Sequence, residues 1–105
     1  MAALVKIAES DFPYHQAVIR GVFRALDKVG LDDESLQGRA IDAAFRWLAG
    51  NHEQTAVYAF TMGFLEQMCK PYPELLPELC DEIARQMPYR TVGFKSRGRK
   101  ILAKR

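Results

Sequence analysis

A long apolar stretch in the middle of the chain, residues 55–69, limits the folds that this sequence can adopt. At about 100° per residue, its apolar side chains cover a continuous helical arc of roughly 200°. A helix on the surface of a globular protein needs an apolar stripe only a little wider than about 100°. The sequence therefore predicts a helix over residues 55–69 that other helices, or a second chain, must cover. The arc contains Val57, Tyr58, Phe60, Met62, Phe64, Leu65, Met68 and Cys69.

Apolar residues at helical spacing also precede Gly30, and they predict an amphipathic helix. Either Ser10 or Asp11 can accept hydrogen bonds from the free amides of its first turn. Pro13 then falls in that first turn, where a proline is tolerated. Gly30 is a natural end for this helix, because glycine is favoured just past a helix C-terminus.

Two more helices are predicted on either side of the central stretch. One begins after a cap at Asp32 or Asp33 and ends at Gly50. The other covers about residues 74–87, with Pro77 in or just beyond its first turn. The fold predicted is all-α, a compact bundle of about four short amphipathic helices. Its helical domain covers residues 1–88, and residues 1–9 are predicted as an arm or a frayed turn.

Residues 89–105 have no lasting periodicity and are predicted as an irregular basic C-terminal tail. This tail holds seven Lys and Arg and no acid, whereas residues 1–87 hold eight Lys and Arg and thirteen Asp and Glu. A dense basic run can neutralise the phosphates of a nucleic acid. It can equally contact an acidic protein surface, including that of its own helical domain, or have no specific role. The candidate contact residues are Lys95, Arg97, Arg99 and Lys100.

Residues capable of catalysis or metal binding are present but do not form a recognisable motif. His15 and His52 lie far from one another in the sequence, and Cys69 and Cys80 do not form the close pair that structural zinc sites use. Both cysteines fall on apolar helix faces, where thiols commonly act as small hydrophobic side chains. The acids between residues 74 and 82 are predicted as a solvated surface. We therefore expect no enzyme activity, no cofactor and no metal.

The composition indicates a reduced compartment. Two cysteines without a C-x-x-C pair are typical of a cytosolic protein. The first residues lack the apolar run of a signal peptide. The apolar run between Glu53 and Glu66 is well short of the about 20 residues of a membrane span. We therefore expect a cytoplasmic protein that does not enter the membrane.

The function that this pattern favours is a small regulatory protein that binds another protein, for example a transcription regulator that it inhibits or modulates. The wide apolar arc predicts a partner or homodimer interface, although the same arc also fits a helix buried inside its own monomer. The alternative function is nucleic-acid binding through the basic tail. The candidate interface residues are Val57, Phe60, Phe64, Leu65 and Met68.

Overall fold

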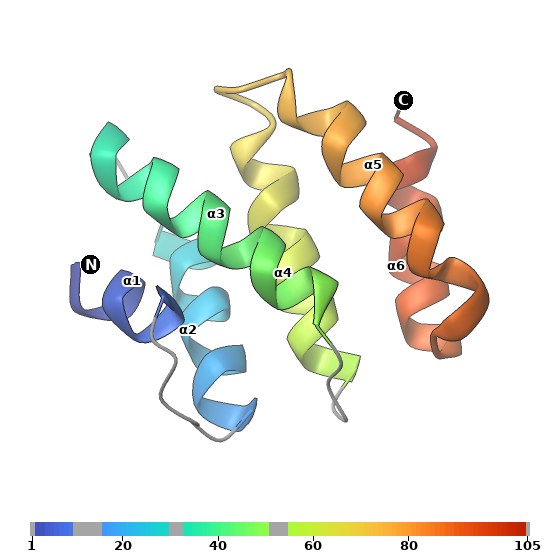
Figure 1. Cartoon of the computed structure of the whole chain (residues 1–105), viewed down its shortest axis with the longest axis horizontal. Coiled ribbons are helices and arrows are strands. Elements are labelled where there is room, and N and C mark those ends of the chain that lie inside the picture. The colour runs from blue at the N-terminus through green and yellow to red at the C-terminus, as the bar shows by residue number, and fades with distance from the viewer. Residues whose placement is uncertain (1, 10–15, 30–32, 51–54, 105) are drawn as a thin grey trace.

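The structure is a computed structural model of the 105-residue chain, and it describes residues 2–9, 16–29, 33–50 and 55–104. Within these residues the chain forms six α-helices and one short 3-10 helix, with no strand, so the predicted all-α class is confirmed (Figure 1). The elements are α1 (Ala2–Glu9), α2 (Gln16–Val29), α3 (Glu34–Ala49), α4 (Thr55–Met68), α5 (Leu75–Gln86), η1 (Met87–Tyr89) and α6 (Val92–Leu102).

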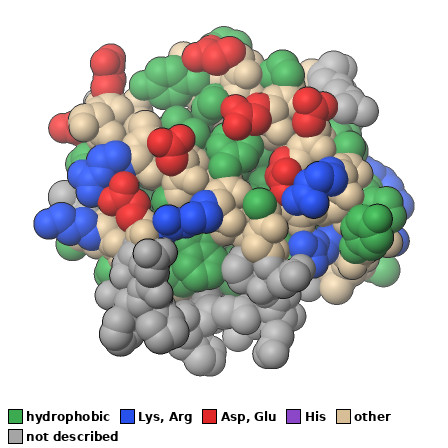
Figure 2. All heavy atoms as spheres, viewed as in Figure 1, with side chains coloured by type: hydrophobic (Ala, Val, Ile, Leu, Met, Phe, Trp, Pro, Cys, Tyr) green, Lys and Arg blue, Asp and Glu red, His purple; other side chains and the backbone are tan. Residues whose placement is uncertain are grey.

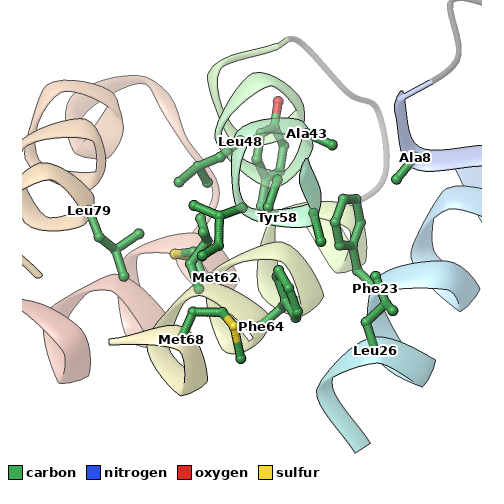
Figure 3. Close-up of a cluster of buried hydrophobic side chains, with 14 of the residues drawn as sticks. Ala8, Phe23, Leu26, Ala43, Leu48, Tyr58, Met62, Phe64, Met68 and Leu79 are labelled. Carbon is green, nitrogen blue, oxygen red and sulfur yellow. The ribbon is translucent and has the colours of Figure 1, made fainter. Parts of the chain in front are cut away.

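Helix α4 lies at the centre of the fold and packs against α2, α3, α5 and α6. Its wide apolar arc explains this position, because Val57, Phe64 and Leu65 are completely buried among side chains of the neighbouring helices. The ring of Phe64 lies 6.0 Å from that of Phe23 on α2, and Figure 3 shows both inside the shared core. The arc is thus covered by helices of the same chain.

The four helices predicted from periodicity correspond to α2, α3, α4 and α5. Asp33 caps α3, since its carboxylate accepts a 3.0 Å hydrogen bond from the backbone amide of Leu36. Gly50 ends the same helix, and Pro77 lies in the first turn of α5. The residues expected to cap the helix before Gly30, Ser10 and Asp11, lie outside the described residues.

The prediction of an arm or frayed turn over residues 1–9 is wrong, because α1 is a packed helix. Val5 and Ala8 are fully buried against α2 and α3. The carbonyl of Ala8 accepts hydrogen bonds from the indole of Trp47 at 2.8 Å and from the guanidinium of Arg46 at 3.0 Å. These side chains of α3 satisfy a helix-end carbonyl that would otherwise lack a partner.

The prediction of an irregular tail is also wrong, because the chain is helical to Leu102. The hydroxyl of Thr91 accepts a 3.4 Å hydrogen bond from the amide of Phe94 and caps α6. Phe94, Gly98 and Ile101 form one buried stripe that faces α4 and α5. At Gly98 an added Cβ would lie 2.8 Å from the Cγ2 of Ile83, so the glycine permits the close approach of α6 to α5.

Candidate protein-binding groove

Helices α3 and α5 lie beside each other on the same side of α4 (Figure 1). Both pack against α4, and they make fewer contacts with each other than with it. Two hollows of about 730 Å³ and about 410 Å³ follow the seam between them, and Glu74 lines both. We call the two hollows together the α3–α5 groove. Figure 2 shows acidic side chains gathered around apolar ones on the face that α3 and α5 form.

The groove has apolar side chains along its length and acids around them. Its apolar lining comes from both helices and from the turn before α5: Ile41, Phe45, Ala49, Tyr72, Leu75 and Pro77. Its charged lining comprises six acids, Glu34, Asp42, Glu74, Glu78, Asp81 and Glu82, and two cations, Arg46 and Arg85. The balance of −4 makes this groove a concentrated acidic region of a chain whose overall charge is +2.

Both cations of the groove are already engaged within the fold. The guanidinium of Arg85 donates to both oxygens of Glu82, and that of Arg46 donates to the carbonyl of Ala8. Within the described part of the chain, no Lys or Arg lies at ion-pair distance from Glu78 or Asp81. The acidic side of the groove therefore retains charge that a cationic ligand can neutralise.

Glu82 differs from the other acids because it is held in a hydrogen-bonded network. Its partial burial by itself would raise the pKa of the carboxyl group. Hydrogen bonds from Arg85 and Gln86 together outweigh that effect, so the pKa of Glu82 lies below its ordinary value. This carboxylate therefore stays charged across the neutral range, and it orients the side chains of Arg85 and Gln86 within α5.

Hydrogen bonds fix the spacing of α3 and α5 at both ends of the groove. At one end, the hydroxyl of Tyr72 donates to the side-chain carbonyl of Gln37 on α3 at 2.6 Å. At the other, the amide of Gln86 donates to the carbonyl of Leu48 at 2.7 Å. Arg90 extends this second contact, because it donates to the side chain of Gln86 at 2.8 Å and to the carbonyl of Gly50 at 3.2 Å. The groove is therefore a preformed feature of the fold.

The five candidate interface residues of the central stretch lie mostly in the core of the monomer. Val57, Phe64 and Leu65 are fully buried, and Met68 is 7% exposed. Phe60 alone of the five is half-buried, with the guanidinium carbon of Arg24 6.0 Å from its ring centroid. The fold thus brings these residues together in its own core, and it leaves little of them to face a second chain.

The four predicted contact residues of the tail lie on α6 in two environments. Arg97 is half-buried, and its guanidinium lies 3.8 Å from the carboxylate of Glu66, which also binds Lys104 at 2.6 Å. The Nε of Arg97 is buried without a hydrogen-bond partner among the described residues. Lys95 is half-buried, and Arg99 and Lys100 are exposed on the outer side of the helix.

The residues considered for chemistry do not assemble into a reactive site in the described regions. His15 and His52 lie outside them. Both cysteines are reduced thiols, Cys80 is fully buried with its thiol 3.9 Å from the carbonyl of Ile101, and burial raises the pKa of the Cys69 thiol. The described residues contain no group of three or more His, Cys, Asp or Glu placed to hold a metal ion. Among the described helices, none has the length and apolar character needed to cross a bilayer.

Sequence reasoning identified the acids of α5 but missed the α3 half of the groove. Phe45 and Ala49 lie one turn apart in the helix that is predicted to end at Gly50, and nothing in its sequence indicates that α5 lies beside them. Their spacing shows that they share a face, but no local pattern reveals which helix is their neighbour. Comparisons with protein-family models, curated proteins and solved structures find no match to this chain, so its function is argued from its own surface.

Proposed function

We propose that this chain is a small non-enzymatic protein that binds a basic amphipathic helix of a partner protein in the α3–α5 groove. The observation that supports the proposal is an apolar groove between two helices with a charge balance of −4. An amphipathic helix binds such a groove by placing its apolar face against the lining. Lysines and arginines beside that face would then meet the acids of α5.

The rigidity of the groove favours binding. Tyr72 and Gln86 hold α3 and α5 at a fixed spacing, so the protein loses little conformational entropy when the groove is filled. The 16 residues of α3 extend for about 24 Å, which accommodates a partner helix of about four turns. The acids would increase the association rate with a cationic partner and discriminate against acidic ones.

A regulatory role follows from this binding mode. A partner helix held in the groove is no longer free to make its other contacts, so the chain would inhibit or modulate the protein that carries the helix. Transcription regulators fit this role, because basic helices commonly make their DNA contacts. A second copy of this chain is the competing occupant, because the exposed Arg99 and Lys100 of its α6 can meet the acids of the groove, although the apolar side of that helix is buried.

The test is titration of a labelled amphipathic helical peptide of leucine and lysine, followed by fluorescence anisotropy. We expect Asp81→Lys and Phe45→Ala each to weaken binding by about tenfold or more. Asp81→Lys removes a contact with a cation of the peptide, and Phe45→Ala removes a large side chain from the apolar lining. The control is the double variant Gln67→Lys and Ala103→Lys, which makes the same charge change as Asp81→Lys at exposed positions outside the groove.

The comparison of these variants distinguishes binding in the groove from a general effect of net charge. Equal weakening by Asp81→Lys and by the control, with no effect of Phe45→Ala, would contradict the proposal. Analytical ultracentrifugation of the protein without peptide measures its oligomeric state, and so tests whether a second copy of the chain occupies the groove. A dimer that Asp81→Lys dissociates would show that the groove binds another molecule of the same chain.

A further inference from the structure

Helix α6 presents a second charged surface, which the α3–α5 groove does not include. Its inner side is the buried stripe of Phe94, Gly98 and Ile101. Its outer side carries the exposed Arg99 and Lys100, and the half-buried Lys95 lies one turn before Arg99. We call these three cations the α6 basic face. Figure 1 shows α6 behind α5, on the side away from the groove.

The cations of the α6 segment differ in whether the fold already uses them. Arg97 and Lys104 lie beside Glu66, and Arg90 bonds to Gln86 and Gly50. By contrast, the three cations of the α6 basic face have no ion pair with any carboxylate in the described regions. Residues 89–105 contain no acid that could neutralise them. Their charge is therefore available to a ligand.

We propose that the α6 basic face binds the phosphate backbone of single-stranded nucleic acid. Lys95 and Arg99 lie about 6 Å apart along the helix axis, so neighbouring turns present cations that can contact successive phosphates. The helix is anchored by its apolar stripe, and the cations are therefore held on a fixed surface. Contacts of this kind give affinity without reading the base sequence.

An exposed aromatic side chain in the turn that precedes α6 in the chain favours a single strand. Tyr89 is 80% exposed in the turn that leads into α6, and it is one of two large hydrophobic side chains that are exposed in the described regions. An aromatic ring beside a basic surface can stack on an unpaired base, a contact that every base can make. In a duplex the bases are already stacked on each other, so this contribution is specific to single strands.

Two other anionic partners fit this surface less well. A helix that lies on a membrane inserts its apolar face into the lipid, but the apolar face of α6 is already buried against α4 and α5. The centre of a protein interface is depleted in lysine and other charged residues and enriched in aromatic residues. Two of the three side chains of the α6 basic face are lysines and none is aromatic, which is the opposite of that composition.

The proposal is tested with a fluorescent 20-nucleotide oligothymidine and the full chain, by anisotropy at about 50 and about 200 mM salt. Three phosphate contacts predict a slope of log K against log salt of about −2, because each contributes about −0.7 on a single strand. The double variant Arg99→Gln and Lys100→Gln should reduce the slope to about −0.7 and weaken binding at low salt by about tenfold or more. Tyr89→Ala should weaken binding by about fivefold or more and leave the slope unchanged.

The matched control is the double variant Lys6→Gln and Lys70→Gln, which removes two exposed cations outside α6. It should bind like the unmodified protein. Equal losses in the two double variants would overturn the proposal, because binding would then follow net charge. Absence of binding at about 50 mM salt, or displacement of the oligonucleotide by an equal charge concentration of polyglutamate, would overturn it as well. An unchanged affinity of Tyr89→Ala would overturn the preference for a single strand.

Discussion

The side-chain amide of Gln86 donates a 2.7 Å hydrogen bond to the backbone carbonyl of Leu48. This contact joins the last turn of α5 to the last turn of α3, where carbonyls have no partner within their own helix. The same amide donates to Glu82 at 2.6 Å, and Arg90 donates to the carbonyl oxygen of Gln86 at 2.8 Å. One buried glutamine therefore fixes the spacing of α3 and α5 at this end of the groove.

Replacing Gln86 should destabilise the fold and loosen the groove. We expect Gln86→Leu to lower the free energy of unfolding by about 2–3 kcal/mol, because the carbonyl of Leu48 and the guanidinium of Arg90 each lose a buried partner. Urea unfolding followed by circular dichroism measures this change. Gln67→Leu is the control, since Gln67 is exposed on α4. A loss below about 0.5 kcal/mol in Gln86→Leu would mean that water or another side chain replaces the contact.

Glu82 makes the stability of this network depend on pH. Its pKa in the folded protein lies below the ordinary value, so the stabilisation is present at neutral pH and is lost as pH falls through the folded pKa. The stability difference between the unmodified protein and Glu82→Gln should therefore shrink between about pH 5 and about pH 3. Urea midpoints across this range give the difference. Glu78→Gln is the control, since it removes an acid of the same helix that no described cation pairs with; a parallel trend in both variants would assign the effect to overall charge.

Gly98 should be the least replaceable of the helical glycines whose surroundings are described. In Gly98→Ala the new methyl group would lie 2.8 Å from Ile83 Cγ2 and 3.1 Å from Met87 Sδ. We expect the free energy of unfolding to fall by about 1–2 kcal/mol, because the cost of overpacking exceeds the gain of about 1 kcal/mol from the higher helix propensity of alanine. A Cβ added at Gly21 has no neighbouring atom within 4 Å, so Gly21→Ala should raise the free energy of unfolding by about 0.5–1 kcal/mol. Thermal unfolding compares the two variants, and equal gains would show that α6 moves to accept the methyl group.

This glycine also explains why sequence reasoning missed α6. The buried stripe of the helix is Phe94, Gly98 and Ile101, and its central member contributes nothing to an apolar pattern. The seven cations of the segment then dominated the interpretation. The signals that remained were Thr91 as a possible cap and the seven-residue spacing of Phe94 and Ile101, which is two helical turns.

The parts of the fold that were predicted correctly depend on dense local patterns. Helix α4 carries large apolar residues at most positions of its arc, and α3 has both a capping residue at Asp33 and a glycine at its end. Helix α1 has eight residues, too few for a periodic pattern to repeat, and contacts with Arg46 and Trp47 hold its last turn. The groove required knowledge of which helices are neighbours, and that depends on contacts between residues more than 20 positions apart in the sequence, such as Leu48 with Gln86.

Phe64 provides the clearest test of whether the apolar arc of α4 serves the core or an interface. Its side chain is fully buried and contacts Phe23, so Phe64→Asp would place an unpaired carboxylate in the core. We expect this variant to unfold. Phe60→Asp should lose less stability and stay folded, because Phe60 is half-buried and Arg24 lies beside its ring. Circular dichroism together with size-exclusion chromatography distinguishes the outcomes. A folded, monomeric Phe64→Asp obtained from a dimeric parent would instead restore the interface that the sequence predicts.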